Sequence, residues 1–132
     1  MRSLARENAV LLIFEYNFQN NPNEYTKELY QQDSKLTDDD KLFMDSLYNG
    51  VIEKYTELSE LIQKYSLDYA FNRIYKVDLS ILLVASYELK YTDTPIPIIV
   101  NEANNLASKY GTDKSPLFVN GILGSIAKET RG

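Results

Sequence analysis

Few side chains in this sequence of 132 residues can carry out chemistry by themselves. The chain contains no Cys and no His, which excludes a thiolate nucleophile, a disulfide framework, an iron–sulfur cluster and the usual proton shuttle. The chemistries that remain are a carboxylate pair with a hard metal ion, a Ser-Lys nucleophile, or a site that binds without reacting. Because no nucleophile, base and orienting group can be assembled from these residue types, we expect a protein that is not an enzyme and needs no cofactor.

The densest group of metal-ligand types is the acidic run Asp38-Asp39-Asp40. Three consecutive residues of a helical turn point in different directions, so their carboxylates do not converge on one ion. Thr37, directly before them, is a typical capping residue, and carboxylates in a first turn stabilise the positive end of the helix dipole. We therefore expect a helix start here and no metal site.

The net charge of −5 is unevenly distributed. Residues 15–60 carry eleven acidic side chains against four lysines, whereas residues 61–132 carry eight basic against seven acidic side chains. Arg2 and Arg6 lie four positions apart and would share one face of a helix, a geometry suited to following a nucleic-acid backbone. A polyanion should avoid the acidic middle of the sequence and bind where these arginines meet the lysines of the second half.

Length and composition are those of one folded domain over residues 1–132. Hydrophobic residues make up 44% and charged residues 25%, which argues against a disordered chain and a pure coiled coil. The first apolar stretch ends at Glu15, and the later run from Leu79 to Ala85 is far shorter than the ~20 residues that cross a bilayer. We expect a cytoplasmic protein without a signal peptide or a membrane segment.

Apolar residues at steps of three and four predict an all-α fold, a single compact bundle of about seven helices. The helices are expected over residues 4–19, 25–31, 37–64, 69–75, 78–89, 94–110 and from 115 onward. The third is the longest. Gly50 inside it costs about 1 kcal/mol relative to alanine, which implies the close approach of another helix.

The segment from Leu79 to Leu89 is apolar nearly all round a helix, which places it at the centre of the bundle. A buried β-strand is the alternative, because a run of seven mostly aliphatic residues cannot be assigned by periodicity alone. The helical patterns on both sides favour a helix.

Four ordered motifs carry a resemblance to a known family. They are Ala5-Arg6-Glu7 with Ala9-Val10; Val77-Asp78, Ile81-Leu82, Ala85 and Tyr87-Glu88-Leu89, then Pro95; Val100-Asn101-Glu102-Ala103, Leu106-Ala107 and Tyr110-Gly111; and Phe118-Val119-Asn120-Gly121-Ile122-Leu123. At these spacings, over essentially the whole chain, the sequence resembles the NusB family of transcription antitermination factors.

The resemblance implies an all-helical fold of two packed subdomains without enzymatic activity. Members of the family bind the boxA element of nascent leader and ribosomal RNA as a single strand. They do so with the ribosomal small-subunit protein that acts as NusE, and the complex helps RNA polymerase to read through terminators. The alternative is a protein-interaction module that docks this ribosomal protein and has little RNA affinity of its own. The sequence leaves open whether the free protein is a monomer or a homodimer.

The resemblance implies two RNA-binding places. At the N-terminus, Arg2 and Arg6 can clamp phosphates; we expect Arg6 to point away from the apolar stripe of its helix, the alternative being a pairing with a carboxylate. At the start of the last helix, Lys114 and Ser115 can touch a phosphate, and Phe118 can stack on a base. Phe118 fits the apolar face of that helix equally well.

Other polar residues of the motifs have structural interpretations. Asn101, Glu102 and Asn120 lie on otherwise apolar helices, which favours a hydrogen-bond network between helices over direct ligand contact. Asp78 is expected to cap the central helix; the resemblance implies the alternative that it contacts the basic ribosomal protein. Leu83 departs from the family, which usually has arginine at this position, so whatever that arginine holds must be held otherwise here.

Overall fold

The computed structural model describes residues 2–19, 21–67 and 69–132, and within these ranges the chain forms α-helices and one 3₁₀ turn, with no strand. The helices are α1 (Arg2–Gln19), α2 (Glu24–Gln31), α3 (Asp38–Glu53), α4 (Tyr55–Tyr65), α5 (Lys76–Tyr91), α6 (Ile96–Tyr110) and α7 (Ser115–Arg131), and the 3₁₀ turn is η1 (Phe71–Arg73). The predicted all-α class is confirmed.

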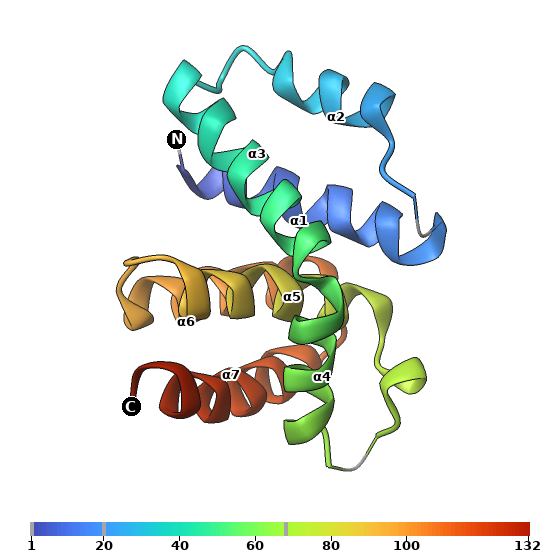
Figure 1. Ribbon diagram of the computed structural model, residues 1–132, viewed down its shortest axis with the longest axis vertical. Coiled ribbons are helices and arrows are strands. Elements are labelled where there is room, and N and C mark those ends of the chain that lie inside the picture. The colour runs from blue at the N-terminus through green and yellow to red at the C-terminus, as the bar shows by residue number, and fades with distance from the viewer. Residues whose placement is uncertain (1, 20, 68) are drawn as a thin grey trace.

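The helices form two packed groups. Helices α1, α2 and α3 make up the upper half of the view in Figure 1, and α4 to α7 make up the lower half. Helix α1 packs against both α3 and α5, so it joins the two groups. None of the helices that the structure describes is long and apolar enough to cross a membrane.

The start of α3 is built as the sequence predicts. The backbone N–H of Asp40 donates to the Thr37 hydroxyl at 3.1 Å, and the Thr37 N–H donates to the Asp40 carboxylate at 3.0 Å. This reciprocal capping box satisfies two backbone donors that a helix start leaves unpaired. Across the described residues, no three acidic side chains gather into a group that could hold a metal ion.

The expectation of one helix over residues 37–64 is wrong, because the chain bends at Lys54. This residue ends α3 and precedes α4, with φ −104° and ψ 18°. Helix α3 packs against α1 and α5, whereas α4 packs against α5 and α7, so the chain must turn from the surface of α1 to that of α7. Apolar spacing continues across the bend because both helices bury a face, which is why the sequence pattern does not reveal it.

Helix α5 is the core of the molecule, and the β-strand alternative is wrong. Residues from Asp78 to Ser86, with Glu88 and Leu89, are all buried, and α5 packs against α1, α3, α4, α6 and α7. A Cβ atom at Gly50 would lie 2.2 Å from Cζ of Tyr87. The predicted close approach at Gly50 is therefore confirmed, and the approaching helix is α5.

The end of α5 is held by the last helix. The Arg131 guanidinium donates to four backbone carbonyls, those of Glu88 at 2.9 Å, Leu89 at 2.8 Å, Thr92 at 2.8 Å and Thr94 at 2.5 Å. It thereby satisfies acceptors that a helix C-terminus leaves unpaired. Leu83, the departure from the family pattern, is fully buried among apolar side chains and needs no polar partner.

Candidate nucleic-acid site

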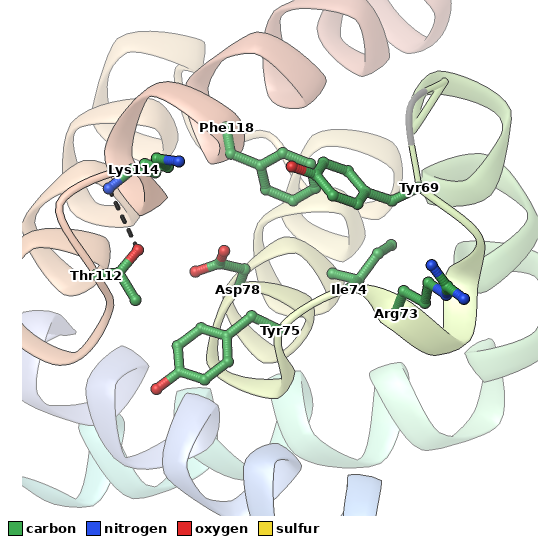
Figure 2. Close-up of a pocket in the computed structure, with 8 residues that line it drawn as sticks. All are labelled: Tyr69, Arg73, Ile74, Tyr75, Asp78, Thr112, Lys114 and Phe118. Carbon is green, nitrogen blue, oxygen red and sulfur yellow. Dashed lines mark hydrogen bonds between the residues drawn. The ribbon is translucent and has the colours of Figure 1, made fainter.

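A pocket of about 180 Å³ opens where the η1 segment, the start of α5 and the start of α7 meet. Figure 2 shows the side chains that surround it. Three of them were singled out from the sequence, namely Asp78, Lys114 and Phe118; the other five are Tyr69, Arg73, Ile74, Tyr75 and Thr112. The volume is below the roughly 300–1,000 Å³ of a typical drug-sized ligand site, so the pocket has room for a small group.

Two aromatic rings line the pocket. The Phe118 and Tyr69 ring centroids lie 5.7 Å apart in an edge-to-face arrangement, and half of the Tyr69 surface is exposed. Phe118 is partly buried and packs against the core. Phe118 therefore packs against the core, as one interpretation predicts, and the ring also lines the pocket; its stacking on a base stays a prediction.

The turn before α7 places Lys114 and Ser115 differently from each other. Lys114 is exposed, and its backbone N–H donates to the Thr112 hydroxyl at 3.2 Å. Ser115 is 1% exposed, and its hydroxyl accepts a hydrogen bond from the Thr112 N–H at 2.9 Å. The Ser115 side chain thus stabilises the turn and, as placed here, is closed to a phosphate, unlike the exposed contact we expected.

Asp78 is not the predicted cap of the central helix. Helix α5 begins at Lys76 and has no side-chain cap, so Asp78 lies within its first turn. The residue is 6% exposed, and its Oδ1 atom has no hydrogen-bond partner in the described part of the chain. Burial raises the pKa of Asp78, and a hydrogen bond with Ser115 partly opposes that rise. The predicted contact with a protein partner is untested by this geometry.

Two cations at the pocket have no structural role in the described residues. Arg73, at the end of η1, and Lys114, before α7, both have exposed side chains and form no ion pair there. Both line the pocket. Charged groups placed in this way can form charge-assisted hydrogen bonds with an anion.

Arg6 does not point away from the core as expected. It is 5% exposed, and it donates from Nε and Nη2 to the two Glu88 carboxylate oxygens at 2.8 and 2.9 Å. Its Nη1 atom lies 3.4 Å from Oε1 of Glu102. The alternative of a carboxylate pairing describes this geometry, since Arg6 ties α1 to α5 and α6. Its contact with RNA is a prediction that the geometry does not support.

Arg2 contacts the same aromatic ring as Arg6, but it is exposed whereas Arg6 is buried. Both guanidinium groups lie over the Phe43 ring, at 4.2 Å for Arg2 and 5.0 Å for Arg6. The two arginines therefore share one side of α1, as their spacing indicates. Arg2 is exposed and lies outside the pocket, next to α3.

The predicted polar network includes only one of its three residues. Glu102 accepts a hydrogen bond from the Ser3 hydroxyl at 2.5 Å and pairs with Arg6, so it joins α6 to α1. Asn101 and Asn120 are exposed. The expectation of an interior network at both asparagines is wrong, because each lies on the solvent side of its helix.

Five of the eight residues that line the pocket are not predicted from the sequence. Two of them are tyrosines, Tyr69 and Tyr75, which are 50% and 49% exposed. The available signal was an Arg and two Tyr in the short stretch before the central helix. Aromatic and basic side chains alternating in a non-helical segment are typical of single-stranded nucleic-acid sites.

Comparisons with known proteins give a consistent result. The family model described as the NusB family matches residues 3–128. "Transcription antitermination protein NusB" of Thermoanaerobacter pseudethanolicus is 34% identical over 128 residues, 97% of this chain and 91% of that protein. The protein of the same name from Agathobacter rectalis is 37% identical over 130 residues, 96% of this chain and 98% of that protein.

Solved structures share the fold. T. maritima NusB superposes with a TM-score of 0.89 at 30% identity, covering 100% of this chain and 94% of that one. A structure of the antitermination factors NusB and NusE in complex with double-stranded RNA has a TM-score of 0.85 at 24% identity, covering 97% of this chain and 96% of that one.

Proposed function

The chain belongs to the NusB family, and from this premise we propose that it is a non-catalytic, RNA-binding factor of transcription antitermination. It binds single-stranded, boxA-type RNA at the pocket between η1, α5 and α7, together with the ribosomal protein that acts as NusE. The complex then acts on RNA polymerase. The observation that carries the proposal is the pair of aromatic rings flanked by Arg73 and Lys114.

The pocket favours an unpaired strand over a duplex. Stacking on Phe118 requires a base that has left its own stack, and single strands supply such bases whereas a duplex hides them. One stacked base contributes about 1–3 kcal/mol. A fold relative was solved with NusE and double-stranded RNA, so a duplex is included in the test below.

Few cations are available for phosphates. Arg2, Arg73 and Lys114 are exposed, while Arg6 is held by Glu88. At about 0.7 per phosphate contact for single strands, three cations give a logarithmic salt slope of about −2. Affinity of the free protein should accordingly be modest, and the ribosomal protein should increase it by adding basic surface.

The test uses Phe118→Ala with Leu117→Ala as its matched control. Leu117 is the preceding residue, 81% exposed and outside the pocket. Binding of fluorescent boxA-type RNA, with and without the ribosomal protein, is measured by anisotropy. We expect Phe118→Ala to weaken binding roughly five- to a hundredfold and Leu117→Ala to change it less than twofold. Equal losses in both variants, or tighter binding of a duplex by the wild type, would contradict the proposal.

The acidic segment favours a second candidate, a module that binds the basic ribosomal protein alone. Residues 15–60 carry eleven acidic side chains against four lysines, a field that attracts a basic partner and repels RNA. The second candidate replaces the first if the ribosomal protein docks on the wild type but binds RNA with the same affinity whether or not this chain is present. Sedimentation of the free protein decides between a monomer and a homodimer.

A further inference from the structure

The aromatic pair in the pocket has a geometry that limits how a base can bind. The Phe118 and Tyr69 ring centroids lie 5.7 Å apart, and the two ring planes cross at 83°. In such an edge-to-face pair the edge of one ring meets the face of the other. A flat base that lies against the face of one ring therefore cannot lie flat against the other ring as well.

We propose that the two rings hold two consecutive bases of the RNA, one on Phe118 and one on Tyr69. The strand bends between them, so that the two bases do not stack on each other. This inference rests on the proposed RNA binding. It adds to that site a second base, which is held by a residue outside the four family-like motifs.

Tyr69 has the exposure that a stacking surface needs. Half of its surface is exposed, whereas Phe118 is partly buried and packs against the core. The pocket of about 180 Å³ suits one small ring at Phe118, so the base on Tyr69 lies at the rim of the pocket. An exposed aromatic ring is suited to stacking, because every base has a flat face.

The backbone of Tyr69 is held from the end of α4 before any ligand arrives. Its carbonyl accepts hydrogen bonds from the Ser66 hydroxyl and from the Gln63 side-chain amide, both at 3.3 Å. Its N–H donates to the Ser66 carbonyl at 3.4 Å. Ser66 is 3% exposed, so this anchor belongs to the folded interior. A ring that is fixed in advance loses less conformational entropy on binding than one on a free loop.

Two cations flank the rings where the phosphates of a two-base step would pass. Figure 2 shows the ring pair between Lys114 on one side and Arg73 on the other, and neither cation forms an ion pair in the described residues. A strand that crosses from one cation to the other brings its phosphates to opposite charges while its bases meet the rings. Single strands can bend in this way, because their bases are readily splayed apart.

A side chain of the ribosomal protein is the other group that could cover Tyr69. Arg73 and Lys114 repel a basic partner at this pocket and attract phosphates. The observations therefore favour RNA, and docking of the ribosomal protein is measured alongside RNA binding in the test.

The test uses fluorescent RNA strands of equal length and charge that lack all bases except one uracil, or except two adjacent uracils. Binding is measured by anisotropy in the presence of the ribosomal protein. We expect wild type to bind the two-uracil strand about five- to a hundredfold more tightly than the one-uracil strand, because a second base stacks. In Tyr69→Ala and Tyr69→Leu this ratio should fall to about twofold, the statistical advantage of two bases for one ring.

Tyr69→Phe and Tyr25→Ala are the matched controls. Tyr69→Phe keeps the aromatic face and should keep the wild-type ratio. Tyr25 is 70% exposed on α2 and does not line the pocket, so its removal should leave the ratio unchanged. Thermal unfolding verifies that each variant is folded. Tyr69→Leu keeps an apolar side chain beside Phe118 and replaces the alanine variant if that one unfolds.

The outcomes separate this inference from the proposed function. If wild type binds both strands equally, or if Tyr69→Leu keeps the wild-type ratio, the second base is overturned while RNA binding at Phe118 stands. A ratio in either control as low as that of Tyr69→Leu would also overturn it. If Tyr69→Leu loses docking of the ribosomal protein and keeps the ratio, Tyr69 serves the protein partner and the inference is overturned. If wild type does not bind intact boxA-type RNA, the proposed function fails, and this inference fails with it.

Discussion

Two buried carboxylates lie on the same helix, and they differ in their hydrogen-bond partners. Near the end of α5, Glu88 is fully buried and meets the Arg6 guanidinium in a two-point pairing at 2.8 and 2.9 Å. In the first turn of α5, Asp78 is almost as buried, yet one of its oxygens has no hydrogen-bond partner among the residues that the structure describes. The paired site holds helices together, and the unpaired site borders a pocket. Satisfaction of hydrogen bonds, rather than burial, distinguishes a structural charge from one that does not stabilise the fold.

The largest effect is expected at the paired site. Arg6→Ala leaves Glu88 buried without its counter-charge, which should lower the free energy of unfolding by about 3–5 kcal/mol. Urea denaturation followed by circular dichroism measures this change.

The matched control replaces both partners. Arg6→Met with Glu88→Leu removes both charges together, so it should recover most of the lost stability, because an apolar pair of similar volume leaves no buried charge. A loss below 1 kcal/mol in the single variant would show that the pairing is not structural and would return Arg6 to the RNA-binding candidates.

A smaller effect of opposite sign is expected at the unpaired site. Asp78→Asn removes a buried charge that lacks a counter-charge and should raise the free energy of unfolding by about 1 kcal/mol at neutral pH. The same urea experiment measures it. A destabilised Asp78→Asn variant would mean that the carboxylate is satisfied in solution, and the contrast between the two sites would disappear.

The stability difference between Asp78→Asn and wild type should also depend on pH. Burial raises the pKa of Asp78 above its ordinary value of 3.8, so the folded state binds this proton more tightly than the unfolded chain does. The stability cost of the carboxylate is complete above the folded-state pKa and disappears as the pH falls below the unfolded value. The stability difference between Asp78→Asn and wild type should therefore shrink on acidification through this range.

The smallest effect is expected at Arg2, which shares the Phe43 ring with Arg6 but is exposed. Arg2→Ala should change the free energy of unfolding by no more than about 1 kcal/mol, because an exposed cation over an aromatic ring contributes about 0.5–1 kcal/mol. Its RNA salt slope should become shallower by about 0.7 if the side chain meets one phosphate. An unchanged slope would confine the RNA site to the pocket.

The sequence was sufficient for features that depend on local pattern. The all-round apolar stretch predicted α5 as the central helix, Thr37 predicted the start of α3, and Gly50 predicted a close helix approach, which Tyr87 makes. Each signal lies within a few residues of the structure it predicts.

Features that depend on distant partners were beyond that reasoning. Arg6 is satisfied by Glu88, which lies 82 positions away, and the spacing of Arg2 and Arg6 is the same whether the second one is buried or exposed. Tyr69 and Arg73 lie in the segment 69–75, for which the sequence predicts a helix, whereas the structure forms only the 3₁₀ turn Phe71–Arg73 there. The predicted helical faces therefore do not indicate which side chains face outward. The sequence pattern also does not predict the bend at Lys54, because buried residues continue at helical spacing through it.

The position of α5 in the chain has a consequence for how the protein is made. During synthesis α1 to α5 emerge before α6 and α7, although both later helices cover α5 and Arg131 binds the carbonyls at its end. A nascent chain that has reached only α5 therefore exposes an apolar surface that its own missing segments will later bury. Such a surface is a binding site for chaperones and a source of aggregation, so the interval between the synthesis of α5 and that of α7 is the vulnerable period of this fold.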